Sequence, residues 1–228
     1  DGGGSIRIPA ACCGLVGLKP TRGRLVPNEM AKGLPVQIVS DGVVTRSVRD
    51  TIAFYVEAEK SFRNSNLYSF TTAYSHPLGV EEGVKQRLPV NKLRIGFFTE
   101  KATGGHVAPD VKAGVLHAAQ LLESLGHHVE EIPLPVKAQF ADDFLLYWGM
   151  LAASLRWGGR LLMGLDFQAS RLETLTYHLA NHFKNHIRHA PAVIRRLKAF
   201  EQDYAMLFSK YDLLLSSTLG TLPPPLGH

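Results

Sequence analysis

The sequence has few cysteines and few tryptophans, two of each in 228 residues, and it has no long hydrophobic run. Cys12 and Cys13 are neighbours in the chain, and a disulfide between neighbours is strained. We therefore expect two buried thiols in a reducing cytoplasm. No apolar run approaches the roughly 18 residues of a membrane span. The first residues also lack the basic and then apolar stretch of a signal peptide, so we expect no membrane partner.

Neither sign of charge dominates the composition. The chain has 25 Lys and Arg against 20 Asp and Glu, a formal net charge of +5. The densest basic cluster, residues 188–198, falls on a predicted helix and is typical of a solvated face. Because no nucleic-acid-binding motif accompanies this charge, we expect no nucleic-acid partner.

The two ends of the sequence suggest a piece of a longer protein. The chain opens on Asp1 without an initiating Met, and it stops after His228 without an element that would finish a sheet. Its 228 residues suffice for one sizeable domain or a large part of one. We expect a single domain segment over 1–228, with an N-terminal and a C-terminal part missing.

Hydrophobic spacing along the chain predicts a layered α/β structure. An apolar run at 93–98 predicts a strand, the three- and four-residue spacing over 109–125 predicts a helix, and 127–132 predicts a second strand. Strand, helix and strand in that order form a βαβ unit. In the first part of the chain we also expect a short helix over 10–15, β structure over 36–45, and a helix over 47–60 that Ser47 caps. A surface excursion is expected over 61–91. The last part should contain helices over 138–208, with breaks near 158–159 and 191, and then a strand over 213–216.

The first residues, Asp1-Gly2-Gly3-Gly4-Ser5, carry the chemistry that the sequence suggests. Glycine removes the Cβ that blocks close approach, so successive backbone N–H groups can point at one spot. Such a nest stabilises the charge that develops on a carbonyl oxygen under attack, and Ser5 would place a hydroxyl beside it. The alternative is a flexible Gly/Ser linker. The apolar continuation over 6–10 argues against a linker.

Residues 1–10 and then 13–24, which include Gly17-Leu18-Lys19-Pro20-Thr21-Arg22-Gly23-Arg24, closely resemble the amidase-signature family. Arg46-Ser47-Val48-Arg49-Asp50 resembles the start of a helix in that family. The resemblance implies an α/β/α sandwich around a mixed sheet, incomplete at both ends here. The same region is similar to that of bacterial amidases that act on linear or cyclic amides, including nylon-oligomer hydrolases.

The resemblance also assigns roles to site residues. It implies a Ser–Ser–Lys triad in which Ser5 is the nucleophile that forms an acyl-enzyme. The oxyanion hole would consist of the backbone N–H groups of Gly2, Gly3, Gly4 and Ser5. Asp1 and Arg7 would support the loop. We expect a small amide substrate and neither a cofactor nor a metal, and we leave homodimer formation open.

The family's second serine and its lysine precede the nucleophile, so both would lie upstream of Asp1. Lys19 belongs to the Lys-Pro-Thr signature and does not replace that lysine. A serine hydroxyl needs a base near neutral pH. We therefore expect this segment alone to be inactive or unfolded.

Two groups of residues leave alternatives open. His178, His182 and His186 recur every four residues, so they form either a metal-binding face or a polar face. The aromatic and methionine residues between 147 and 163 form either core packing or an apolar lining for the acyl half of the substrate; they are Tyr147, Trp148, Met150, Trp157 and Met163.

The sequence is consistent with three functions. The first is an amidase, with ester cleavage as a variant of the same mechanism. The second is an inactive, truncated remnant of an amidase. The third is a non-hydrolytic amidotransferase subunit that hands ammonia to a partner. The pattern typical of the amidase-like subunit of glutaminyl-tRNA amidotransferases is lacking over 33–42, which favours a stand-alone amidase.

Overall fold

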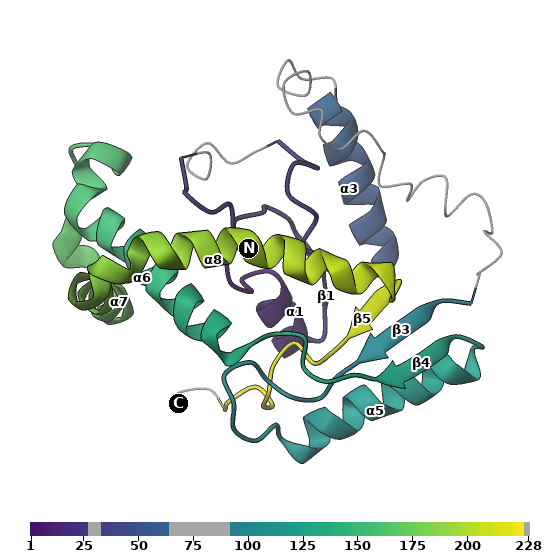
Figure 1. Ribbon diagram of the computed structural model, residues 1–228. Coiled ribbons are helices and arrows are strands. Elements are labelled where there is room, and N and C mark those ends of the chain that lie inside the picture. The colour runs from purple at the N-terminus through teal and green to yellow at the C-terminus, as the bar shows by residue number, and fades with distance from the viewer. Residues whose placement is uncertain (27–32, 64–91, 226–228) are drawn as a thin grey trace. The chain divides into compact units, whose positions relative to one another are not determined.

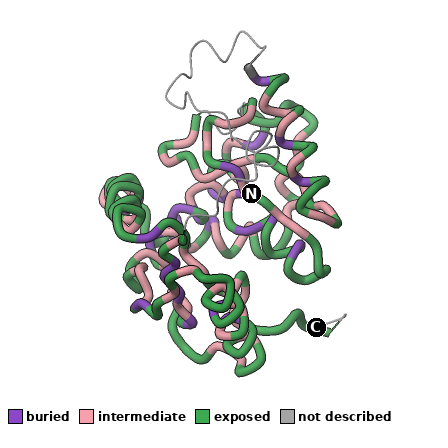
Figure 2. The backbone as a smooth tube through the Cα atoms, turned by 90° about the vertical axis from the view of Figure 1, so that its right-hand side faces the viewer, coloured by how far each residue is buried: buried purple, intermediate pink, exposed green. Residues whose placement is uncertain are grey.

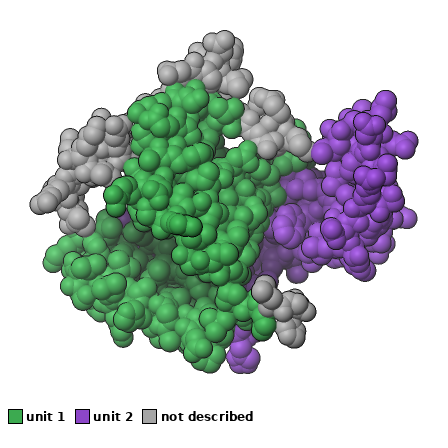
Figure 3. All heavy atoms as spheres, turned by 180° about the vertical axis from the view of Figure 1, so that it is seen from behind, with its two compact units in different colours: residues 1–99, 107–130, 213–228 green, residues 100–106, 131–212 purple. Residues whose placement is uncertain are grey.

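The computed structural model describes residues 1–26, 33–63 and 92–225 (Figure 1). The chain divides into two compact units, coloured separately in Figure 3. Unit 1 comprises 1–99, 107–130 and 213–228, and unit 2 comprises 100–106 and 131–212. A single domain over 1–228 stays a prediction.

The N-terminal part of unit 1 places a short helix against a small antiparallel ribbon. Helix α1 (Arg7–Cys13) precedes strand β1 (Val16–Gly17). Strand β1 pairs antiparallel with β2 (Val44–Thr45), and helix α3 (Val48–Arg63) follows. The Ser47 hydroxyl accepts a hydrogen bond from the backbone N–H of Asp50 at 3.1 Å, so Ser47 caps α3 as predicted.

The rest of unit 1 is a three-stranded sheet with a helix on one face (Figure 1). Its strands lie in the order β4 (His128–Glu131), β3 (Arg94–Phe97) and β5 (Leu213–Leu215), and β3 and β5 are parallel. Helix α5 (Pro109–Ser124) joins β3 to β4 and buries Val115 and Ala119 against Phe97. The predicted strand, helix and strand are present, and the α/β class is confirmed.

Unit 2 is helical. Its long helices are α6 (Ala138–Met163), α7 (Thr174–His186) and α8 (Ala190–Ala205), with α6 packed on both others. Short 3-10 turns η2 (Ala169–Arg171), η3 (Ile187–His189) and η4 (Met206–Ser209) accompany them. Figure 2 shows short buried stretches between exposed ones along the chain, as expected of helices that bury one stripe.

Three expectations are wrong in detail. Within 36–45 only Val44 and Thr45 form a strand, and Ser40 instead bonds to the backbone of Asp1. Helix α6 continues through the glycines at 158–159 and ends at Gly164, whose φ is +102°. Cys12 and Cys13 are exposed, since α1 buries only Ala10.

Two further expectations concern segment boundaries. The predicted break near Pro191 is confirmed, because α8 begins at Ala190 and has Pro191 in its first turn. Residues 61–63 belong to α3, and the remainder of the excursion predicted over 61–91, from 64 onward, lies outside the described residues.

Candidate active site

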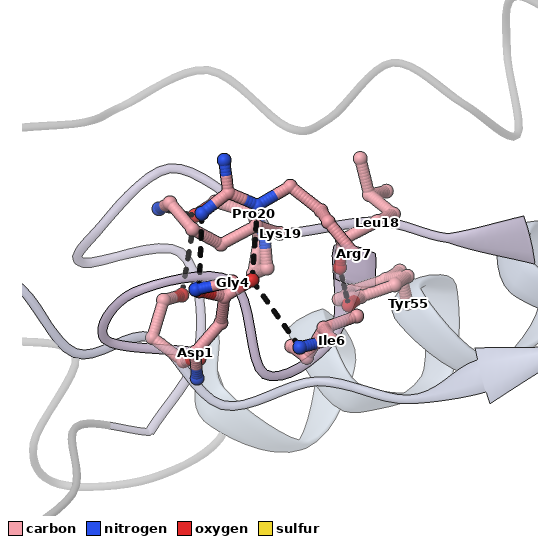
Figure 4. Close-up of polar contacts among 9 residues, drawn as sticks. Asp1, Gly4, Ile6, Arg7, Leu18, Lys19, Pro20 and Tyr55 are labelled. Atoms are coloured by element: carbon pink, nitrogen blue, oxygen red, sulfur yellow. Dashed lines mark hydrogen bonds and ion pairs between the residues drawn. The ribbon is translucent and has the colours of Figure 1, made fainter. Parts of the chain in front are cut away.

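The Asp1 carboxylate organises the glycine loop at the start of the chain (Figure 4). The backbone N–H of Gly4 donates to Oδ1 of Asp1 at 2.6 Å, and that of Ile6 donates to Oδ2 at 3.3 Å. Asp1 is buried, so these charge-assisted bonds form away from bulk water. The carboxylate thus closes a tight turn that has Ser5 at its tip.

Arg7 completes this arrangement from the first turn of α1. Its Nε lies 3.0 Å from Oδ2 of Asp1, and its Nη2 lies 3.1 Å from Oδ1. This bidentate contact fixes the plane of the carboxylate as well as its position. The structure therefore brings together the two residues that the sequence assigned to support of the loop.

The backbone conformation at position 4 favours glycine over every other residue. Its φ is +124°, which disfavours any side chain, and an added Cβ would lie 2.5 Å from Cδ1 of Ile8. The amide of Gly4 already has the Asp1 carboxylate as its acceptor. The oxyanion-hole role predicted for Gly4 therefore competes with a hydrogen bond inside the loop.

The other three predicted oxyanion-hole donors, Gly2, Gly3 and Ser5, differ from Gly4 in exposure and in hydrogen bonding. Ser5 is exposed, Gly3 is exposed and Gly2 is half-buried. Among the residues that the structure describes, no acceptor binds the backbone amides of Gly2, Gly3 or Ser5. Of the four predicted donors, only the Gly4 amide therefore has an acceptor within the described residues.

A distant segment supports the loop from outside. The backbones of Asp1 and Ser40 exchange two hydrogen bonds, with N–O distances of 2.5 and 3.1 Å. The neighbouring Val39 and Ile38 side chains come within 3.5 and 3.8 Å of the position of a Cβ on Gly2. Gly2 therefore lies against an apolar wall.

The Lys-Pro-Thr signature lies beside the same loop (Figure 4). The Lys19 ammonium donates to the Pro20 carbonyl at 3.0 Å. Burial is the main cause that lowers the pKa of Lys19 below its usual value, and the positive charges of Arg22 and Arg7 lower it further. Since Lys19 is tied to its own turn, its contact agrees with the structural role that the sequence suggested.

Sequence reasoning missed two supports of this site. Tyr55, almost wholly buried, donates its hydroxyl hydrogen to the Leu18 carbonyl at 2.5 Å. An added Cβ on Gly42 would lie 2.3 Å from the Tyr55 hydroxyl. Tyr55 matched only a helix-face pattern, and Ser40 has no local signal, because both act on residues more than 35 positions away.

Two of the three histidines of α7 lie side by side, and they do not belong to a group of three potential metal ligands within the described residues. The rings of His182 and His186 lie 4.6 Å apart, but Nδ1 of His186 contacts the His182 carbonyl oxygen at 2.8 Å. Over the described ranges, no three His, Cys, Asp or Glu side chains meet in a group that could hold a metal ion. In the same ranges, no helix is long and apolar enough to cross a membrane.

The aromatic residues of α6 divide between two environments. Tyr147 is buried, as core packing predicts, whereas Trp157 and Met163 are more than half exposed. The Arg156 guanidinium stacks over Tyr177 at 4.6 Å and over Trp157 at 5.7 Å. Core packing therefore explains only part of this cluster.

Sequence comparison shows that this chain is similar to amidases. The family model described as Amidase matches residues 1–228. AmiC of Mycobacterium tuberculosis, named a putative amidase, is 45% identical over 230 residues, which cover 100% of this chain and 46% of AmiC. The 6-aminohexanoate-cyclic-dimer hydrolase of Paenarthrobacter ureafaciens is 35% identical over 58% of this chain and 26% of its own length.

Solved structures agree on the fold. A 6-aminohexanoate cyclic dimer hydrolase complexed with substrate matches with a TM-score of 0.74 and 24% identity, over 94% of this chain and 45% of that one. A bacterial aryl acylamidase of the amidase signature family matches with a TM-score of 0.73 and 20% identity, over 98% and 46% of the two chains.

The chain thus spans about half the length of the proteins that it matches. The match to the family model extends over all of its residues, the glycine loop and the Lys-Pro-Thr turn included. The chain belongs to the amidase family, whose amidase-signature α/β fold it shares.

Proposed function

We propose that this chain supplies the nucleophile and the oxyanion-binding loop of an enzyme that hydrolyses a carboxylic amide. The observation that carries the proposal is the exposed Ser5 at the tip of a loop closed by Asp1 and Arg7. Beside that hydroxyl are backbone amides without an acceptor in the described residues. Family membership supports the same chemistry.

In the proposed reaction, the Ser5 hydroxyl oxygen attacks the amide carbon as a base takes its proton. The carbonyl oxygen becomes an anion, which the N–H groups of Gly2, Gly3 and Ser5 stabilise. The C–N bond then breaks, and the amine leaves with a proton returned by the base. Water hydrolyses the resulting ester on Ser5 in the same way, and an ester substrate follows the same path.

Within the part of the chain that the structure describes, no base contacts Ser5. Lys19 is held by its own turn, and no described residue forms a hydrogen bond with the Ser5 hydroxyl. We propose that the second serine and the lysine of the Ser–Ser–Lys triad come from polypeptide outside residues 1–228. The chain alone would then be inactive.

The decisive experiment replaces Ser5 with alanine in the intact protein. Turnover of an aryl amide and labelling by a fluorophosphonate probe should both disappear, while the thermal unfolding temperature stays unchanged because Ser5 is exposed. Ser124→Ala, at an exposed hydroxyl residue at the end of α5, is the matched control and should keep both. Turnover that survives Ser5→Ala would refute the proposal.

The substrate class is proposed from two relatives. The 35% identity to a 6-aminohexanoate-cyclic-dimer hydrolase covers 58% of the chain and supports a linear or cyclic amide. The acylamidase of Rhodococcus erythropolis is 29% identical over 99% of the chain and supports an acyl amide. Turnover of a panel that contains both kinds of amide, with matching esters, would rank them.

A non-hydrolytic amidotransferase subunit is the second candidate. A glutamyl-tRNA(Gln) amidotransferase subunit of Exiguobacterium sp. is 27% identical over the whole chain, a lower identity than that of AmiC. Ammonia-dependent activity, together with a stable complex between the protein and a second polypeptide, would favour this candidate over the amidase.

A further inference from the structure

The Tyr55 hydroxyl lies at the end of the small antiparallel ribbon formed by β1 and β2. The last residue pair of that ribbon is Gly17 with Val44. In the same register, Leu18 would next face Val43. The Tyr55 hydroxyl instead donates to the Leu18 carbonyl at 2.5 Å (Figure 4), and it accepts a hydrogen bond from the Val43 backbone. A side chain of α3 therefore bridges the two backbones where the ladder would otherwise continue.

This bridge needs a hydroxyl that donates and accepts at once. Burial raises the pKa of Tyr55 above its usual value, against a lowering by the hydrogen bond from Val43. The hydroxyl therefore keeps its proton at neutral pH and remains a donor to Leu18.

The bridge lies against the residue that follows Ser5. Tyr55 is 1% exposed. An added Cβ on Gly42 would overlap the Tyr55 hydroxyl, and it would lie 2.9 Å from Cδ1 of Ile6 and 3.2 Å from the Leu18 carbonyl oxygen. Because Gly42 has no side chain, the hydroxyl, the carbonyl and the Ile6 side chain can meet at one point.

Ile6 connects this meeting point to the nucleophile loop. Its side chain is buried, and its Cγ2 lies 3.2 Å from the position of a Cβ on Gly17. Its backbone N–H donates to Oδ2 of Asp1 at 3.3 Å. Ile6 is therefore held between β1 and Gly42, and a shift of either one moves the residue next to Ser5.

Ser40, two residues before Gly42, provides a second connection to the nucleophile loop. Its backbone exchanges two hydrogen bonds with that of Asp1. Its hydroxyl donates to the Pro20 carbonyl at 3.1 Å. The segment that carries Gly42 thus joins the nucleophile loop to the Lys-Pro-Thr turn at a second point.

We propose that Tyr55 is a positioning residue for the attack by Ser5. Its hydroxyl sets the spacing of the two backbones at the end of the ribbon, and Ile6 and Ser40 transmit that spacing to the nucleophile loop. The inference rests on the proposed function, since it concerns the alignment of Ser5 and the loop amides with a substrate carbonyl. A displacement of about 1 Å at such a site can cost about 100-fold in rate.

Tyr55→Phe in the intact protein removes the bridge and keeps the ring. The Leu18 carbonyl and the Val43 N–H then either lose their partner or approach each other, and both outcomes change the spacing. We expect kcat for an aryl amide and the rate of labelling by a fluorophosphonate probe to fall by about 10- to 100-fold. The KM should stay within about threefold, since a loss of alignment in the transition state lowers kcat and kcat/KM equally.

Tyr177→Phe is the matched control. The Tyr177 hydroxyl also donates to a backbone carbonyl, that of Ala169 at 2.7 Å, but it belongs to unit 2. Tyr177→Phe should lower the thermal unfolding temperature, as Tyr55→Phe does, and leave kcat and the labelling rate unchanged. 4-Aminophenylalanine at position 55, which keeps a donor at the end of the ring, should restore most of the labelling rate.

Unchanged kcat and labelling in folded Tyr55→Phe would overturn the inference, and so would an equal fall in Tyr177→Phe. If Tyr55→Phe does not fold, Ser40→Ala decides the question, because it removes only the hydroxyl bond to Pro20. Its labelling rate should fall by less than that expected for Tyr55→Phe, and an unchanged rate would overturn the inference. Turnover that survives Ser5→Ala refutes the proposed function itself, so the two failures give different results.

Discussion

The Asp1 carboxylate accepts four hydrogen bonds, two from backbone amides and two from Arg7. In the intact protein, Asp1→Asn removes the charge and turns one acceptor into a donor that faces those N–H groups. We expect the free energy of unfolding to fall by about 1.5–3 kcal/mol, the range for hydrogen bonds to charged groups. We expect kcat/KM for an aryl amide to fall by about 100-fold, because the donors move away from the carbonyl oxygen.

Arg7→Lys is the companion change for this residue-scale prediction. Lysine keeps the positive charge but contributes a single point contact, so the loss should be smaller than for Asp1→Asn. Urea unfolding and steady-state kinetics measure both effects. Unchanged kinetics in Asp1→Asn would show that the loop keeps its shape without the carboxylate.

At the scale of an element, two adjacent glycines of α6 give opposite predictions. An added Cβ on Gly159 would lie 2.1 Å from the Phe167 ring, whereas one on Gly158 would meet only a Leu162 methyl at 3.9 Å. Gly159→Ala should destabilise by about 1–3 kcal/mol through overpacking. Gly158→Ala should stabilise by up to about 1 kcal/mol, the helix propensity difference. Thermal unfolding of both variants tests this pair, and equal effects would contradict it.

The contact between α6 and α8 predicts a pH dependence. The Arg196 guanidinium binds the buried Asp143 carboxylate through two bonds of 2.6 and 2.7 Å, and hydrogen bonding to Arg196 lowers the pKa of Asp143 against the opposing effect of burial. A carboxyl whose pKa is lower in the folded state stabilises the protein above its unfolded pKa, about 3.9. This stabilisation is lost as the pH falls through the folded pKa.

We therefore expect the free energy of unfolding to decrease below about pH 4, and Asp143→Asn to flatten that decrease. At pH 7, Asp143→Asn should cost about 1.5–3 kcal/mol. The control is Asp142→Asn, one position away and exposed, which should leave the acid limb unchanged. Guanidinium unfolding across the acid range up to neutral pH provides the measurement, and parallel acid limbs for the two variants would contradict the prediction.

For the whole molecule, we expect activity to require more than these 228 residues. The chain spans 46% of AmiC, and no described residue forms a hydrogen bond with the Ser5 hydroxyl. The isolated chain should not turn over an aryl amide, whereas a chimera in which this chain replaces the shared region of Mycobacterium tuberculosis AmiC should. Circular dichroism of the isolated chain shows whether it folds, and turnover by a folded isolated chain would contradict the prediction.

Much of the local structure was predictable because short-range chemistry decides it. Ser47 caps α3, Pro109 opens α5, Pro191 lies in the first turn of α8, and strand β3 forms within the apolar run at 93–98. The Asp-Gly-Gly-Gly-Ser-Ile-Arg pattern likewise predicted a supported turn, and Asp1 and Arg7 meet as expected. In each case the interacting groups lie within a few residues of one another.

The sequence by itself determined the family, the α/β class and the loop that presents Ser5, because a continuous pattern of glycines and charges encodes a local turn. Only the tertiary structure decided that Gly4 donates to Asp1, that Gly159 seats Phe167 inside an unbroken helix, and that Cys12 lies exposed. These outcomes depend on which atoms occupy the space beside a residue. Contacts between positions far apart in the chain largely decide which atoms lie there, and the local spacing of residue types does not predict those contacts.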